Sequence, residues 1–317
     1  MIKFDQITKK YPDGTVAVDR LELEVRKGEF LVLIGPSGCG KTTTLKMINR
    51  LIPYSSGEIF IGGKPVDTYP LDQLRWNIGY VLQQIALFPH MTIEENITVV
   101  PEMKGWPKDK LKERAAELLE MVGLDPSTYA ARKPAELSGG QQQRIGVIRA
   151  LAADPDILLM DEPFSALDPV SREKLQDDLL RLKKTLGKTT VFVTHDMQEA
   201  LKLADRICLM REGRIVQLGT PEELLHRPQD DFVRSFIGSR DAEQRIDLAP
   251  ALALNGIAAP SALTLPSHVP VRRLLEVLAN HERAGVEKDG RFIGTIDRAS
   301  AFRLLAELSG KEAGEDE

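Results

Sequence analysis

The stretch GPSGCGKTT, residues 35–43, combines the residue types that bind the phosphates of a nucleotide. It matches the pattern G-x-x-x-x-G-K-[ST], with Gly35, Gly40, Lys41 and Thr42 at the defined positions. Backbone N–H groups of such a loop surround the phosphates, the lysine reaches the β- and γ-phosphates, and the Thr42 hydroxyl is offered to Mg²⁺. The residues predicted to contact the nucleotide are Gly35, Pro36, Ser37, Gly38, Cys39, Gly40, Lys41, Thr42 and Thr43.

The residues on either side favour a phosphate loop over a glycine-rich turn that contains a lysine by chance. Residues 29–34 (EFLVLI) are apolar and favour a strand. Residues 42–50 lead into a helical pattern, with Leu45, Ile48 and Leu51 on one face. The positive N-terminal end of that helix would add to the attraction for phosphate.

A second apolar run, residues 157–161 (ILLMD), ends in a carboxylate and is followed by Glu162. Ligands of a doubly wound sheet bind at the carboxyl ends of its strands. We therefore expect Asp161 to hold Mg²⁺ through its hydration shell, and Glu162 to polarise a water that attacks the γ-phosphate. An exposed acidic turn is the alternative interpretation, which the phosphate loop in the same chain disfavours.

LSGGQ, residues 137–141, is a second sequence that could bind an anion. Ser138, Gly139 and Gly140 at a predicted helix start form a nest of N–H groups without a lysine of its own. The phosphate loop already supplies one such nest, so the second needs a separate explanation.

These motifs occur together in one order along the chain. They are Tyr11, GPSGCGKT, Gln83, LSGGQ, LMDEP, SALD at residues 165–168, and His195. The set resembles the nucleotide-binding subunits of ATP-binding cassette (ABC) transporters, and the resemblance covers residues 1 to about 238. It implies an ATPase that uses ATP and Mg²⁺.

The resemblance also explains the second nest. Two subunits of this family pack head-to-tail, so that each ATP lies between the phosphate loop of one subunit and the LSGGQ of the other. A homodimer is therefore implied, with Ser138 and Gly140 contacting the γ-phosphate across the interface and Asp168 steadying the partner's loop. Gly139 and Gln141 of the same motif are also expected among the nucleotide-binding residues.

Three further roles follow from the resemblance. Gln83 would bind Mg²⁺ and the attacking water, and His195 would hydrogen-bond the γ-phosphate. Gln84 is the alternative to Gln83, which directly ends the predicted strand 77–83. Taken alone, Tyr11 would be interpreted as a half-buried strand residue, but the resemblance favours a role in which its ring stacks on the adenine. The remaining histidines are interpreted as structural or exposed: His90, His226, His268 and His281.

Longer stretches narrow the resemblance. The segments GPSGCGKTTTLKMINRL, YVLQQIALFPHMTIEENI and SGGQQQRIGVIRALAADP are similar to subunits of importers for glycine betaine, carnitine, choline and proline. The implied partners are a membrane permease and a periplasmic or extracellular substrate-binding protein, with this subunit at the cytoplasmic face. Residues 84–106 are the expected permease contact, and Phe88, Pro89 and Met91 either face it or pack internally. An importer of another solute, such as a polyamine or an amino acid, remains an alternative, as does a soluble ABC protein acting on ribosomes or DNA.

Composition agrees with a globular protein that binds no nucleic acid. The 317 residues are 42% hydrophobic and 28% charged, and the net charge of −5 argues against affinity based on overall basicity. Cys39 and Cys208 predict no disulfide framework and favour a reducing cytosol. No apolar run approaches the roughly 20 residues that span a bilayer, so work at a membrane would go through a partner.

The order of predicted elements indicates an α/β phosphate-loop NTPase fold with a mostly parallel sheet, an N-terminal antiparallel part and a helical subdomain at about 85–153. Residues 1–238 are expected to form the ATPase domain. A linker rich in Ala, Leu and Pro follows, and residues 239–317 also hold one small module with an acidic tail.

The C-terminal module reads as β-α-β-β-α over residues 261–308, with Asp289 and Gly290 in a hairpin turn. It resembles one cystathionine-β-synthase (CBS) module, of a kind that usually works in pairs, so pairing across the dimer is expected. The nucleotide-contacting segment G-x-x-[ST]-x-x-D reads GTIDRAS at 294–300, with Asp297 in place of the hydroxyl and Ser300 in place of the carboxylate. An interaction or osmotic-sensing module is therefore favoured over one that binds an adenosine ligand.

Overall fold

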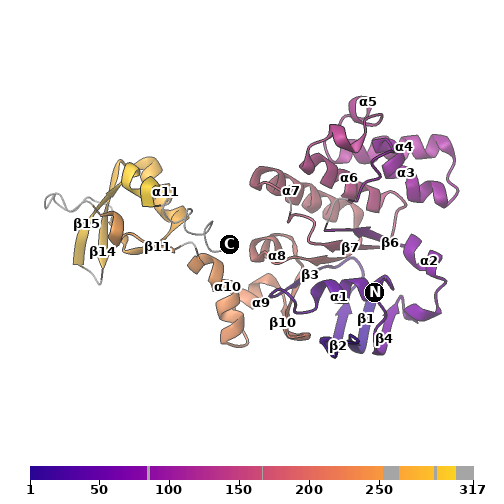
Figure 1. Cartoon of the computed structure of the whole chain (residues 1–317), viewed down its shortest axis with the longest axis horizontal. Helices are drawn as coiled ribbons and strands as arrows, with labels where there is room; N and C mark the ends of the chain where they lie inside the picture. Colours follow the sequence, from indigo (N-terminus) through magenta and orange to yellow (C-terminus); the bar gives the residue numbers. More distant parts are fainter. Residues whose placement is uncertain (84–85, 166, 244, 253–263, 289–290, 305–317) are drawn as a thin grey trace. The chain divides into compact units, whose positions relative to one another are not determined.

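The computed structural model describes residues 1–317 except 84–85, 166, 244, 253–263, 289–290 and 305–317. The chain forms two compact units, Met1–Arg234 and Ser235–Glu317. Figure 1 traces the elements of both units along the chain.

A six-stranded sheet is the centre of the first unit, and its strand order is β10-β9-β3-β8-β7-β6. The strands are β3 (Phe30–Ile34), β6 (Ile78–Val81), β7 (Ile157–Asp161), β8 (Thr189–Val193), β9 (Arg206–Arg211) and β10 (Arg214–Gly219). All neighbours pair in parallel except β9 and β10, which form an antiparallel hairpin. The predicted α/β class with a mostly parallel sheet is confirmed. The carboxyl ends of β7 and β8 lie side by side, because Asp161 pairs with Val193.

A four-stranded antiparallel sheet packs with the first helix against this centre. Its order is β2-β1-β4-β5, made of β1 (Ile2–Lys10), β2 (Val16–Val25), β4 (Ser56–Ile61) and β5 (Lys64–Pro65). Helix α1 (Lys41–Ile48) contributes Leu45, Met47 and Ile48 to one buried cluster that includes residues of both sheets. In Figure 1, α1 lies on one side of the six-stranded sheet, with α6 and α7 on the other. The predicted antiparallel N-terminal part is confirmed.

Helices lie on both sides of β6 in the sequence. Before β6 come η1 (Val66–Thr68) and α2 (Leu71–Trp76). The segment between β6 and β7 holds α3 (Ile93–Met103), α4 (Lys108–Met121), α5 (Pro126–Tyr129), η2 (Pro134–Glu136) and α6 (Gly139–Leu151). Helix α3 begins with a reciprocal capping box between Thr92 and Glu95. Arg114 of α4 donates to the carbonyls of Leu151 and Ala152 at 3.2 and 3.3 Å, which satisfies the C-terminal end of α6. The predicted helical insertion is therefore tied to the sheet through α6.

The face of the six-stranded sheet that lies away from α1 is covered by α7 (Pro169–Leu186) and α8 (Met197–Leu203). Phe192 of β8 packs on Phe30 and Phe164, with ring centroids 5.7 and 5.4 Å apart. Short α9 (Pro221–His226) follows β10, and α10 (Asp231–Glu243) follows α9. Within the described part of the chain, no helix combines the length and apolar character that crossing a membrane requires.

The second unit has its own core. It contains β11 (Arg245–Asp247), η3 (Ala249–Ala251), β12 (Thr264–Pro266), β13 (His268–Pro270), α11 (Val271–Asn280), β14 (Arg283–Lys288) and β15 (Arg291–Asp297). The strands form a β11-β13 pair and a three-stranded β12-β14-β15 sheet. Residues 298–304 are helical, so the order of the predicted small module is present. Ile246 and Leu248, in the segment expected to be a linker, are buried in this core. The predicted turn at 289–290 and the acidic end lie outside the described residues.

One strand is shorter than predicted. The sequence indicated a strand over residues 77–83, but β6 ends at Val81, which pairs with Met160. Leu82 is 40% exposed, so burial no longer holds the chain against the sheet at that position. Gln83 therefore lies just beyond the strand end.

Candidate nucleotide site

The phosphate loop joins β3 to α1, and two of its glycines are needed for close backbone approach. A Cβ at Gly35 would lie 2.1 Å from the carbonyl oxygen of Met210, and a Cβ at Gly40 would lie 2.3 Å from that of Ala17. Any other side chain would force these segments apart. Pro36, Ser37 and Gly38, at the tip of the loop, are exposed, whereas Cys39 and Gly40 are buried. Thr43 is half-buried in the first turn of α1.

Lys41 is a buried cation at this loop, with only 6% of its surface exposed. Its Nζ donates hydrogen bonds to the carbonyls of Gly35 at 2.7 Å and Pro36 at 3.0 Å, and lies 3.8 Å from Cys39 Sγ. Among the described residues, no carboxylate forms an ion pair with Lys41. Because a buried charge is costly unless it is compensated, this ammonium group fits an anion held at the loop. Phosphate oxygens meet that requirement.

A carboxylate and a hydroxyl meet beside the loop. Thr42 Oγ1 donates to Asp161 Oδ1 at 2.7 Å, although these residues lie far apart in the sequence. Asp161 is only 4% exposed, and burial raises the pKa of its carboxyl group, an effect that the hydrogen bond from Thr42 opposes. A bound divalent cation would compensate the desolvated charge. The pair therefore fits Mg²⁺, which prefers a few protein oxygens together with phosphate oxygens and water.

Within the described residues, no group of three or more His, Cys, Asp or Glu side chains is arranged around a common metal position.

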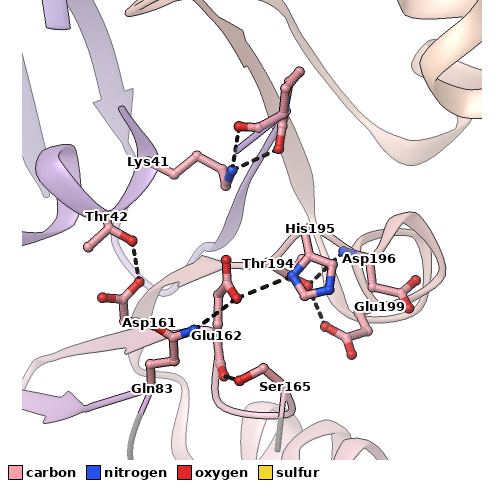
Figure 2. A network of polar contacts seen from close by, with 12 residues as sticks. Lys41, Thr42, Gln83, Asp161, Glu162, Ser165, Thr194, His195, Asp196 and Glu199 are labelled. Carbon is pink, nitrogen blue, oxygen red and sulfur yellow. Dashed lines mark hydrogen bonds and ion pairs between the residues drawn. The ribbon is translucent and has the colours of Figure 1, made fainter. Parts of the chain in front are cut away.

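Glu162 is the meeting point of a second group of side chains, which Figure 2 shows beside the Thr42–Asp161 pair. Gln83 Nε2 donates to Glu162 Oε2 at 3.4 Å, and His195 Nδ1 lies 3.2 Å from the same oxygen. The Glu162 backbone has a positive φ of 44° and its N–H donates to Val193 O at 3.0 Å. Ser165 Oγ donates to the Glu162 carbonyl at 3.0 Å. The carboxylate is thus carried on an unusual backbone conformation that the surrounding hydrogen bonds hold in place.

The structure brings together Gln83, Glu162 and His195, which the sequence had placed in separate motifs. Gln84 lies outside the described residues. Of the other histidines, His90 packs on Phe88 and His268 lies 4.0 Å from Asp247, while His226 and His281 are exposed. None of these four forms a hydrogen bond with Glu162 in the described part of the chain.

Tyr11 follows the last residue of β1, at the turn into β2. Its N–H donates to Thr15 O at 2.9 Å, and Lys9 Nζ lies 5.0 Å from the centre of its half-buried ring. The same hairpin reaches the phosphate loop, since Ala17 limits the space at Gly40. An aromatic ring is therefore available on a hairpin that touches the loop.

LSGGQ forms the N-terminal end of α6. Ser138 is the N-cap, its Oγ accepts from Gln141 N, and Gln141 Oε1 accepts from Ser138 N at 2.9 Å. Gly139 is exposed and a Cβ there would meet no atom within 4 Å, whereas a Cβ at Gly140 would lie 2.9 Å from Ser171 Oγ. In the described residues, no hydrogen bond or ion pair joins residues 137–141 to residues 35–43. The second nest thus stands open in the single chain.

Helix α7 begins next to this nest. Asp168 is its N-cap and its Oδ1 accepts from Ser171 N at 3.0 Å. Deeper in the same helix pair, Arg144 of α6 and Asp178 of α7 form a buried ion pair with 3.6 Å between Nε and Oδ2. Burial raises the pKa of the Asp178 carboxyl group, while the charge of Arg144 opposes that shift. Helices α6 and α7 therefore approach each other closely at their starts, and an ion pair joins them further along.

Sequence reasoning missed two residues next to His195. Thr194 and Glu199 are buried and form a hydrogen bond of 2.5 Å between Thr194 Oγ1 and Glu199 Oε2. The available signal was a glutamate on the first turn of the helix that follows His195, at a position otherwise suited to an apolar residue.

Comparison with known proteins decides the family. The family described as ABC transporter matches residues 18–165. The osmoprotectant import ATP-binding protein OsmV of Salmonella typhimurium is 50% identical over 308 residues, which are 95% of this chain and 80% of that protein. This chain belongs to the ABC transporter family.

Two further proteins are similar to a large part of this chain. The glycine betaine/carnitine/choline transport ATP-binding protein of Bacillus subtilis is 58% identical over 238 residues. That match takes in 75% of this chain and spans 62% of the length of the Bacillus protein. A dimeric ATP-binding cassette solved in a post-hydrolysis state with ADP and Pi aligns with a TM-score of 0.63 at 36% identity, over 70% of this chain and 99% of its own. The resemblance to ABC subunits, and among them to those of quaternary-amine importers, is confirmed.

Proposed function

We propose that this chain is the ATP-hydrolysing subunit of an importer for glycine betaine or a related quaternary amine. The observation that carries the ATPase assignment is the buried Lys41, which forms no ion pair with a carboxylate among the described residues and lies at the same sheet edge as Glu162. The names of similar proteins support the cargo assignment, because they act on glycine betaine, carnitine, choline or other osmoprotectants.

Within the proposed site, the phosphate loop and Lys41 bind the phosphates of ATP. Exposed Ser37 and Gly38 offer N–H groups, and Lys41 would exchange one or both carbonyl contacts for phosphate oxygens. Thr42, Asp161 and Gln83 would hold Mg²⁺, which neutralises developing charge on the phosphates when bound. Tyr11 would stack on the adenine from its hairpin.

Glu162 is the proposed general base. Its carboxylate would accept a proton from the water that attacks the γ-phosphate, while Gln83 orients that water. His195, 3.2 Å from the same carboxylate, would hydrogen-bond the γ-phosphate and keep Glu162 directed at the water. Stabilisation of charge and positioning would supply most of the rate enhancement, as is usual for phosphoryl transfer.

A complete site is proposed to need a second copy of the chain. In the part of the chain that the structure describes, the LSGGQ nest makes no hydrogen bond to the phosphate loop, and a similar cassette was solved as a dimer. In a head-to-tail homodimer, Ser138, Gly139, Gly140 and Gln141 would face the γ-phosphate held by the partner. Asp168, at the start of α7, would meet the partner's phosphate loop.

A groove beside Gln83 is the proposed surface for the permease. It has a volume of about 460 Å³, and its lining is mainly apolar, with Trp76, Tyr80, Phe88, Val99, Val100 and Met103 among its residues. Phe88 is 41% exposed and Met103 is 67% exposed, and Arg149 of α6 donates to the Ala86 carbonyl at 2.6 Å in its wall. Of the residues expected to face a partner, Phe88 and Pro89 are exposed and Met91 is half-buried. An apolar helix from a permease would link this groove to both Gln83 and the LSGGQ helix.

The second unit is proposed to be a regulatory module related to CBS modules that does not bind an adenosine ligand. Asp297 Oδ1 accepts from Ser300 N at 2.8 Å, which caps the helix that follows. Gly294 packs against Leu252, whose side chain would lie 3.2 Å from a Cβ there. These positions therefore have structural uses in the single chain. Pairing with the partner's module and sensing of ionic strength are the proposed roles.

Three experiments test the function. Lys41→Ala should abolish measurable ATP binding by isothermal titration calorimetry, and unchanged affinity would refute the assignment of the loop. Uptake of labelled glycine betaine at high osmolarity should depend on this chain, with labelled spermidine as the competing cargo. Spermidine uptake that depends on the chain, without betaine uptake, would favour the alternative importer. The chain should also co-purify with a multispanning membrane protein, and the absence of such a partner would favour a soluble ABC protein.

A further inference from the structure

The turn that carries His195 is fixed on both sides of that residue. Thr194 N donates to Leu33 O at 3.2 Å, which anchors the end of β8 to β3. Asp196 caps α8, because its Oδ1 accepts from Gln198 N at 2.8 Å. His195 itself is exposed, and its ring nitrogen lies beside Glu162. Hydrogen bonds therefore constrain the backbone around His195 more than they constrain its exposed imidazole ring.

The Thr194 hydroxyl connects these two anchors. It donates to Glu199 Oε2 at 2.5 Å and accepts from Asp196 N at 2.9 Å (Figure 2). These two hydrogen bonds together fix the orientation of the hydroxyl group. Both hydrogen bonds join Thr194, which precedes His195, to residues that follow it. One partner is the backbone N–H of Asp196, and the other is Glu199 in α8. Rotation of the turn would break both contacts at the same time.

Glu199 places a carboxyl group at a buried position, where removing it from water costs free energy. Its side chain lies in the first turn of α8 and is only 5% exposed, next to Met197, Ala200 and Leu203 of the same buried helix face. An apolar residue would pack there without the cost of taking a carboxylate out of water. The Glu199 side chain supplies a hydrogen-bond acceptor for the Thr194 hydroxyl at this buried position, which an apolar side chain would not.

We propose that Thr194 and Glu199 are positioning residues that hold His195 in the orientation needed at the γ-phosphate. This role rests on the ATPase function proposed above, and it concerns residues that do not touch ATP. A fixed turn keeps the imidazole close to Glu162 before the phosphate arrives, so less reorganisation is needed in the transition state. Small misplacements at such a site are costly, and roughly a hundredfold loss of rate for a displacement near 1 Å is typical.

A double-mutant cycle with His195→Ala tests the proposal. Thr194→Val removes the hydroxyl at nearly constant shape and should lower kcat roughly 10- to 100-fold with little change in KM for ATP. Thr194→Ser keeps the hydroxyl and should restore most of the activity. Thr190→Val is the matched control, since Thr190 is a buried threonine on β8 whose backbone N–H, like that of Thr194, bonds to the β3 side of the sheet. It should leave kcat unchanged.

The cycle separates a positioning role from a general structural one. If Thr194 acts through His195, adding Thr194→Val to His195→Ala should lower kcat no further. Independent, multiplied losses in the double variant would overturn the proposal while leaving the ATPase assignment intact. Glu199→Gln provides a second test that preserves shape and an acceptor oxygen, and it should show the same dependence on His195. Wild-type protein without ATPase activity would overturn the proposed function and this role together.

Discussion

Gly139→Ala is the substitution that separates folding of this chain from assembly of its proposed dimer. An alanine Cβ at position 139 would meet no heavy atom within 4 Å, so the folded chain needs no adjustment. At the next position, a Cβ would lie 2.9 Å from Ser171 Oγ and 3.0 Å from Ser171 Cβ. Gly140→Ala must therefore push α6 away from α7, at a cost of about 1–3 kcal/mol typical of overpacking.

In the proposed dimer, the methyl group at position 139 would stand between the start of α6 and the γ-phosphate bound by the partner. A hydrogen bond to a charged group contributes about 1.5–3 kcal/mol. A symmetric dimer has two equivalent sites, so loss of one bond at each would weaken it by about 3–6 kcal/mol. The dissociation constant of the ATP-bound dimer should then rise roughly 10²- to 10⁴-fold.

The assay is sedimentation of the dimer in the presence of ATP and Mg²⁺, with Glu162→Gln as background to slow hydrolysis. Gly139→Ala should keep the free energy of unfolding within about 0.5 kcal/mol of the parent, as exposed substitutions generally do, and should bind ATP as a monomer. Gly140→Ala is the comparison variant, and it should lower the free energy of unfolding of the chain in addition to weakening the dimer. An unchanged dimer dissociation constant for Gly139→Ala would refute the reasoning that the nest meets the partner's nucleotide.

Three other predictions follow from the site and its supports. Glu162→Gln should reduce phosphate release roughly 10²- to 10⁴-fold and accumulate an ATP-bound dimer on gel filtration, and normal turnover would remove Glu162 as the base. Asp161→Asn should stabilise the nucleotide-free protein at pH 7 in denaturant titrations, because burial raises the pKa of this carboxyl group and its charged form therefore disfavours folding. That advantage should fade as the pH falls towards the unfolded value near 3.8, and an advantage that grows in acid would contradict it. Asp178→Ala leaves the buried Arg144 without its partner and should cost about 3–5 kcal/mol of unfolding free energy, which the double variant Arg144→Met with Asp178→Leu should largely recover.

Local pattern was sufficient for most elements of this protein. The apolar runs at residues 29–34 and 157–161 located β3 to within one residue and β7 with the bounds that the structure has. The phosphate loop could also be read locally, because its glycines, lysine and threonine are neighbours in the chain. Helix starts at Thr92 and Ser138 carry their capping signals within a few residues. These features depend on interactions between residues close in sequence, so the sequence alone determined them.

The arrangement of the side chains in the candidate site depends on contacts between residues far apart in the sequence, which no local pattern encodes. Strand order brought Asp161 to Thr42 and placed Gln83 and His195 around one oxygen of Glu162. The exposed end of β6, rather than its apolar run, decided where Gln83 leaves the sheet. The use of Glu199 as a buried support for Thr194 became visible only once α8 was packed on β3 and β8. Which distant groups meet depends on how the sheet is assembled and what its helices bury, and this is set by tertiary packing of the whole unit.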